Sequence, residues 1–182
     1  MQAGLTITVR PARPDDAYDI AAVHVAGWQS AYPGIVPDRS LVDMSTVRQA
    51  ASYASMIRHD GGVFVAVAGD EIVGFTSVGR HRHAGLADGE IYTLYVLDDW
   101  REAGIGRQLM QTGVRRLLAE GCRSVFLWVL SDNPSRWFYQ HLGGRAVAVG
   151  NTPVGGQAVA QTAYIWNPIE ILLAATEPKL KH

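Results

Sequence analysis

The fold of this chain is decided by one stretch, Leu94-Tyr95-Val96-Leu97-Asp98-Asp99-Trp100-Arg101-Glu102-Ala103-Gly104-Ile105-Gly106-Arg107. A strand here leads into a turn that contains glycines, and the turn opens an amphipathic helix. The first amide N–H groups of a helix have no partner within the helix and together carry roughly half a positive charge. Gly104 and Gly106 let a phosphate approach this backbone closely, and Arg101 and Arg107 add cationic donors. The stretch therefore predicts an anion-binding turn.

Two nucleotide-binding motifs do not fit this turn. A P-loop requires Gly-x-x-x-x-Gly-Lys-Ser/Thr, which the stretch does not contain. A dinucleotide fingerprint requires a third glycine at the position of Leu109. A plain connection from strand to helix, with no ligand, stays open as the alternative interpretation.

On either side of the turn, apolar spacing predicts the remaining elements. Strands are expected at 5–10, 63–67, 72–78, 90–96, 124–130, 145–149 and 157–166. Helices are expected from Asp15 or Asp16 to about Trp28, at 42–57, from Ile105 to an end at Gly121, and at 136–142. The order indicates one α/β (α+β) domain over residues 1–176, with a mixed sheet of about seven strands flanked by about four helices. Residues 177–182 are expected to form a loose tail.

The signature Arg101-Glu102-Ala103-Gly104-Ile105-Gly106 resembles the Arg/Gln-x-x-Gly-x-Gly/Ala motif of the GNAT superfamily of acyl-CoA-dependent N-acetyltransferases. The strand Glu90–Val96 and the segment Asp132–Gly144 are also similar to family motifs, and the resemblance covers residues 80–150 closely. It implies a GNAT fold, acetyl-CoA as the acyl donor, and direct attack by a bound amine. The cofactor-binding residues that it implies are Leu94, Tyr95, Val96, Arg101, Glu102, Ala103, Gly104, Ile105, Gly106, Arg107 and Asn133.

Acetyl transfer to an amine requires a base and an acid, because an ammonium group has a pKa of about 10.4 and the departing thiol one of about 8.5. The resemblance implies that Glu90 removes the amine proton through water and that Tyr139 protonates the sulfur. Tyr139 follows Asn133 by six residues, where many members have seven. For Glu90, the alternative is a solvated carboxylate at the start of a strand. For Tyr139, the alternative is an aromatic side chain packed in the core. Cys122 lies at the end of the long helix and is interpreted as structural, against covalent catalysis.

The acceptor site is expected near Trp28 and Tyr32, which are four residues apart on one helix face. This segment is similar to one that roofs the acceptor pocket in one bacterial branch of the family, and core packing is the alternative. The run Arg80-His81-Arg82-His83 raises a metal-site hypothesis, but a solvated loop is preferred and no metal site is expected. Its positive charge would suit an acceptor that bears a carboxylate or phosphate.

Composition and charge limit the classes of partner that are expected for this chain. The chain has 182 residues, a net charge of -1 and one cysteine, so strong nucleic-acid affinity and an internal disulfide are not expected. No window is apolar enough to span a membrane, and a cytoplasmic location is expected. A homodimer through an open sheet edge is a further expectation. The first choice of acceptor is the primary amine of a small molecule; a protein N-terminus or lysine, or a non-catalytic acyl-CoA sensor, are the alternatives.

Overall fold

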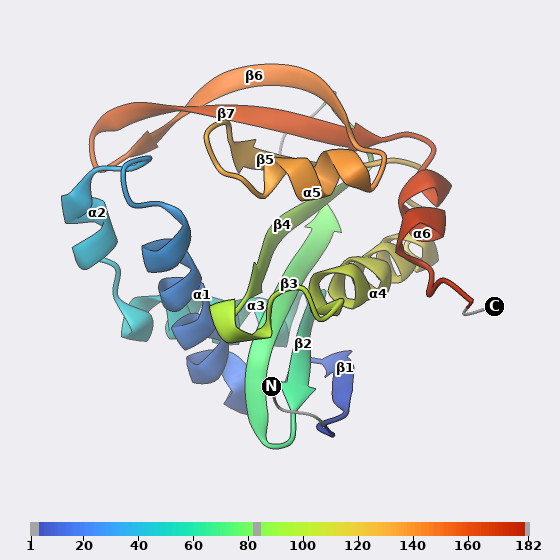
Figure 1. The fold of residues 1–182 in the computed structure, drawn as a ribbon, viewed down its shortest axis with the longest axis horizontal. Coiled ribbons are helices and arrows are strands. Elements are labelled where there is room, and N and C mark those ends of the chain that lie inside the picture. Colours follow the sequence, from blue (N-terminus) through green and yellow to red (C-terminus); the bar gives the residue numbers. More distant parts are fainter. Residues whose placement is uncertain (1–3, 82–84, 181–182) are drawn as a thin grey trace.

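A mixed sheet of seven strands runs through the computed structural model, which describes residues 4–81 and 85–180 (Figure 1). The strand order is β1-β2-β3-β4-β5-β7-β6; β4 and β5 pair in parallel and every other neighbouring pair is antiparallel. The strands are β1 (Ile7–Pro11), β2 (Val63–Ala68), β3 (Glu71–Arg80), β4 (Gly89–Val96), β5 (Val125–Leu130), β6 (Arg145–Val154) and β7 (Gln157–Trp166). The predicted mixed α/β sheet is confirmed.

Six α-helices and two short 3-10 helices flank this sheet within the described ranges. They are η1 (Pro14–Asp16), α1 (Ala17–Ala31), α2 (Asp38–Val42), α3 (Thr46–His59), η2 (Asp98–Trp100), α4 (Ile105–Ala119), α5 (Arg136–His141) and α6 (Glu170–Thr176). Figure 1 shows α1 and α2 on one side of the molecule, and α4 and α6 on the other. The contacts between helices are consistent with this arrangement: α1 packs on α3, and α4 packs on α6.

Two of these helices were not expected. The predicted helix 42–57 begins only at Thr46, as α3, because Ser45 adopts an extended backbone and its hydroxyl accepts a hydrogen bond from the Arg48 amide at 3.3 Å. The short helix α2 lies before it, where no helix was predicted. The C-terminal helix α6 has only 7 residues, too few for a clear apolar period. Its buried side chains, Leu172 and Thr176, show that tertiary packing holds it in place.

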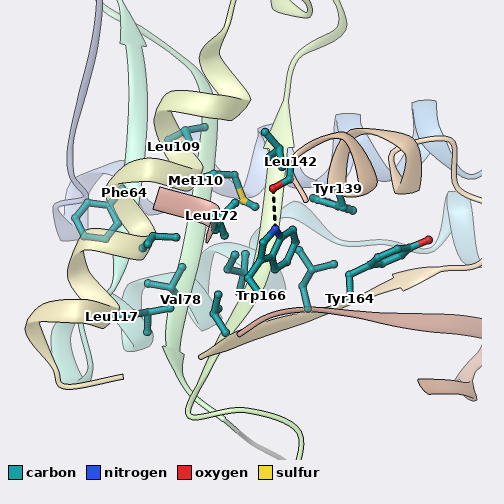
Figure 2. Packing of buried hydrophobic residues seen from close by; sticks show 14 of the residues in the cluster. Phe64, Val78, Leu109, Met110, Leu117, Tyr139, Leu142, Tyr164, Trp166 and Leu172 are labelled. Carbon is teal, nitrogen blue, oxygen red and sulfur yellow. Dashed lines mark hydrogen bonds between the residues drawn. The ribbon is translucent and has the colours of Figure 1, made fainter. Parts of the chain in front are cut away.

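The main core lies between the sheet and the pair α4 and α6, and Trp166 is at its centre (Figure 2). The Trp166 side chain is fully buried, and its indole N–H donates to the Leu142 carbonyl oxygen at 3.0 Å. A second cluster, which includes Ile20, Tyr53 and Phe75, packs on the opposite face of the sheet beneath α1 and α3. Both faces of the central strands are therefore buried, which explains their continuous apolar runs.

Strands β6 and β7 form a long hairpin that arches over one end of the molecule (Figure 1). β6 continues to Val154, beyond the predicted 145–149, because it pairs with β7 along its whole length as far as the Gly155-Gly156 turn. β6 is one edge of the sheet, and the expected homodimer stays a prediction.

No helix within residues 4–81 and 85–180 combines the length and the apolar character needed to cross a membrane.

Candidate functional site

A cavity of about 830 Å³ lies between β4 and β5 and is also walled by the end of α1, the turn before α4, and α5. Most of the residues singled out from the sequence meet here. Those that line the cavity are Tyr32, Leu94, Tyr95, Val96, Arg101, Glu102, Gly104, Ile105, Gly106, Arg107, Asn133 and Tyr139. Trp28, Glu90 and Ala103 are not among its described lining residues.

The cavity exists because two parallel strands separate after a short pairing. β4 and β5 pair only at Gly89 with Val125 and at Glu90 with Phe126. Opposite β3, the register places Ile91 next to Val78 and Thr93 next to Ser77, so Tyr92 is an extra residue in β4. Such a bulge bends a strand and disrupts its ladder locally. The backbone from Leu94 to Val96 therefore borders the cavity, where an extended ligand could pair with it as an added strand.

The predicted anion-binding turn has the expected backbone. Gly104 has a positive φ of 79° and precedes α4, whose first amides it cannot cap because it has no side chain. Glu102, with φ 62°, is the one non-glycine residue of the described ranges in this left-handed region. A Cβ at Gly106 would meet the Phe138 ring at 3.6 Å, an ordinary contact. Packing thus does not require glycine at position 106, whereas the close approach of a phosphate would.

The two arginines of the turn are tied to neighbouring elements. Arg101 forms a salt bridge of 3.0 Å with Asp98, whose carboxylate accepts a hydrogen bond of 2.5 Å from the Ser30 hydroxyl. The Arg107 guanidinium donates to the carbonyl oxygen of Ala175 near the end of α6. A cation at the C-terminal end of a helix, here α6, is favourable because it interacts with the negative end of the helix dipole. The C-terminal helix thereby braces the turn, which the sequence did not indicate.

Three polar side chains from distant parts of the chain meet at the cavity wall. The Asn133 amide nitrogen donates to the Tyr32 hydroxyl at 3.2 Å, and the Tyr95 hydroxyl also bonds to Tyr32. The Asn133 side-chain oxygen accepts from the Ser135 amide at 2.9 Å. Burial raises the pKa of Tyr32, Tyr95 and Tyr139, so all three phenols are protonated at neutral pH.

Two predicted site residues, Glu90 and Trp28, are not among the described residues that line the cavity. Glu90 is 1% exposed at the point where β4 and β5 are paired, and its role as a base stays a prediction. Trp28 packs edge-on against Tyr32, with ring centroids 4.5 Å apart, and its indole N–H donates to the Ser40 carbonyl. Its direct contact with an acceptor also stays a prediction.

The basic run after β3 is described only in part, because Arg82 and His83 lie outside the described residues. Arg80 donates to the Glu120 carbonyl oxygen at 2.7 Å, at the C-terminal end of α4, and it is not among the described lining residues of the cavity. Cys122 is 2% exposed in the main core, and burial raises the pKa of its thiol. This burial agrees with a structural role for Cys122.

The sequence analysis placed Tyr95 only among the cofactor-binding residues and did not single out Gly27 as a site residue. The Tyr95 ring crosses α1 at Gly27, where a Cβ would lie 2.4 Å from the ring carbon Cδ1. The Tyr95 ring also stacks on His24, with centroids 4.8 Å apart. A glycine inside a helix lowers the stability of that helix, so its presence usually has a packing or functional reason. Gly27 could therefore have been used to predict a close contact at this point of α1.

His24 provides a pH-dependent test of this packing. Its Nδ1 is 2.8 Å from the Tyr53 hydroxyl, and burial lowers its pKa from 6.5 to about 4. The unfolded chain therefore binds a proton at His24 more readily than the folded one. Stability is unaffected above about pH 6.5 and falls as the pH drops towards about 4.

We expect His24 to account for a loss of about 3 kcal/mol in the free energy of unfolding over this pH range. Urea unfolding at several pH values measures the loss. The matched variant His24→Asn keeps a polar side chain but does not titrate, so it should show a smaller decrease than the wild type. Equal decreases in the two proteins would contradict the assignment.

Comparisons with known proteins identify the family of this chain. Residues 27–143 match the model of the acetyltransferase (GNAT) family. The uncharacterized N-acetyltransferase YuaI of Bacillus subtilis is 36% identical over 171 residues, 91% of this chain and 96% of that protein. Two solved structures have similar folds: a GCN5-related N-acetyltransferase of Rhodopseudomonas palustris (TM-score 0.72, 22% identity, 89% of this chain and 96% of that one) and yncA of Salmonella typhimurium, solved with its cofactor acetyl-CoA (TM-score 0.67, 19% identity, 89% and 94%). Through its family match and its similarity to YuaI along almost the whole chain, this protein belongs to the GNAT family of acetyltransferases.

Proposed function

We propose that this protein transfers the acetyl group of acetyl-CoA to the primary amine of a small molecule, which attacks directly while both substrates are bound. The observation that carries the proposal is a single cavity that joins the anion-binding turn before α4 to a wall of phenol and amide groups. A volume of about 830 Å³ is typical of small-molecule sites. One end suits a phosphate-bearing donor, and the other suits a small polar acceptor.

The chain provides separate groups for separate parts of the donor. Backbone amides from Glu102 to Arg107 would hold the pyrophosphate at the start of α4. The edge of β4 at Leu94–Val96 would pair with the extended arm, and Asn133 would orient that arm from the opposite wall. Bound acetyl-CoA supplies the acetyl group as a reactive thioester.

Two side chains carry out the proton transfers in the proposed reaction. Glu90 takes the amine proton through water, which requires a water path from its buried position to the cavity. Tyr139 lines the cavity, and burial keeps its phenol protonated. Its O–H can therefore donate to the sulfur as the thiolate departs.

Replacing Tyr139 by phenylalanine is expected to lower kcat by about a hundredfold or more, because the thiolate then leaves without a proton donor. The KM for acetyl-CoA should change little, since the phenyl ring keeps its packing against Trp166, 6.4 Å away between centroids. Steady-state kinetics over a range of pH measures both constants. If the variant kept the wild-type kcat at every pH, Tyr139 would not be the acid.

The function itself is tested by mass spectrometry of a pooled panel of small amines incubated with acetyl-CoA, together with a cofactor-binding isotherm on the same sample. An acetylated small amine supports the proposal and identifies the acceptor class. Binding of acetyl-CoA without any small-molecule product contradicts it. Peptides with free N-termini and lysines, run in parallel, distinguish a protein acceptor from a sensor that binds without turnover.

A further inference from the structure

The hydroxyl of Tyr32 holds an unusual position, because it joins two other polar groups at the cavity wall. Asn133 donates to it from the loop before α5, and Tyr95 bonds to it from β4. Tyr32 itself lies at the end of α1 and is 8% exposed. A hydroxyl on three converging elements is fixed in orientation by its partners.

The protons of this group can be counted. A phenol has one O–H donor and two acceptor positions. At Tyr32, the Asn133 amide occupies one acceptor position, and the Tyr95 hydroxyl is a second hydrogen-bond partner of the same oxygen. The side-chain oxygen of Asn133 is engaged by the Ser135 amide. The pair of phenols thus holds one proton more than the bond between them uses.

Both phenols border the cavity, and we assign the remaining proton to Tyr32. The Tyr95 ring packs against His24 and Phe75, with centroids 4.8 and 5.8 Å away, and against Gly27 of α1, and the hydrogen-bond partner of its hydroxyl is Tyr32. With Tyr95 as the donor of that bond, Tyr32 accepts from both Asn133 and Tyr95. Its own O–H is then left for a ligand in the cavity.

We propose that Tyr32 is a further catalytic residue, whose hydroxyl donates a hydrogen bond to the thioester carbonyl oxygen as that oxygen becomes negative. This role rests on the proposed function. As the C–N bond forms, the π pair of the carbonyl moves onto oxygen; it returns as the C–S bond breaks. The amine nitrogen loses one proton and the sulfur gains one, while Tyr32 keeps its own proton throughout.

The carbonyl oxygen suits Tyr32 better than the sulfur does. Burial raises the pKa of Tyr32, which favours donating a hydrogen bond over giving up the proton. Negative charge develops on two atoms of a thioester, and Tyr32 and Tyr139 are among the tyrosines that border the cavity. One phenol can therefore serve each atom, and a donor fixed in advance is the arrangement that stabilises developing charge most.

The test compares Tyr32→Phe with Tyr53→Phe. Both variants lose one buried hydroxyl from the same side of the sheet, but Tyr53 bonds His24 and is not among the described lining residues of the cavity. We expect Tyr32→Phe to lower kcat by about 10²-fold to 10³-fold, with the KM for acetyl-CoA and the shape of the pH profile nearly unchanged. Tyr53→Phe should keep kcat. A purely structural role would leave kcat of Tyr32→Phe near that of the control.

A second measurement does not depend on the acceptor. Isotope-edited infrared spectra of acetyl-CoA labelled at the acetyl carbonyl report its hydrogen bonding when bound. In the wild type and in Tyr53→Phe, the carbonyl stretch should lie below its frequency in Tyr32→Phe. Equal frequencies in all three would overturn the role of Tyr32. If the wild type shows the shift but acetylates no amine, the proposed function fails while the Tyr32 contact stands. Circular dichroism and the binding isotherm verify that each variant is folded.

Discussion

Replacing Trp166 by alanine is expected to lower the free energy of unfolding by about 3 to 5 kcal/mol, the typical cost of deleting a buried tryptophan. The indole is fully buried between α4, α6 and the sheet (Figure 2). Its N–H donates to the Leu142 carbonyl, which would lose that partner inside the core. A cavity and an unsatisfied carbonyl therefore act in the same direction.

Trp137→Ala is the matched control for this measurement. Trp137 is 59% exposed on α5, and the Arg136 guanidinium lies over its ring at 4.7 Å. Its removal should cost less than about 1 kcal/mol, since exposed cation–π contacts are weak. Urea unfolding of both variants, with the denaturant slope checked against the wild type, gives the two values. Similar losses in the two variants would show that Trp166 does not hold the core together.

Replacing Gly27 by alanine should reverse the usual effect of that substitution in a helix. Alanine normally stabilises a helix by about 1 kcal/mol relative to glycine. Here the new Cβ would lie 2.4 Å from the Tyr95 ring, which has to move away from α1. We expect a net loss of about 1 to 3 kcal/mol in the free energy of unfolding, as for overpacked cores.

The displaced Tyr95 ring would also carry its hydroxyl away from Tyr32. We therefore expect kcat/KM of Gly27→Ala to fall by about tenfold or more. Ala26→Gly, at the exposed neighbouring position of the same helix, is the opposite change and serves as control. It should lower stability by about 1 kcal/mol and leave kcat/KM as it is. Wild-type activity in Gly27→Ala would show that the position of Tyr95 does not matter for the site.

The sequence alone was sufficient for features that depend on neighbours along the chain. The strand, turn and helix from Leu94 to Arg107 are dictated by alternation, two glycines and a helical apolar face, and the structure has all three parts. The start of α3 after Ser45 could have been predicted, because a serine before a helix is a common cap. Such signals are local, so they survive in a single sequence.

Only the tertiary structure decided which of these residues share a cavity. Asn133 and Tyr32 are 101 residues apart in sequence yet bond at 3.2 Å, because the separation of β4 from β5 brings α1 and α5 to one wall. No spacing rule can encode this meeting, which depends on how three elements pack. Arg107 likewise reaches α6, a helix too short to be recognised from its own residues. The sequence determined the glycine-containing turn before α4 through local backbone preferences, whereas long-range packing decided which polar side chains share the cavity wall.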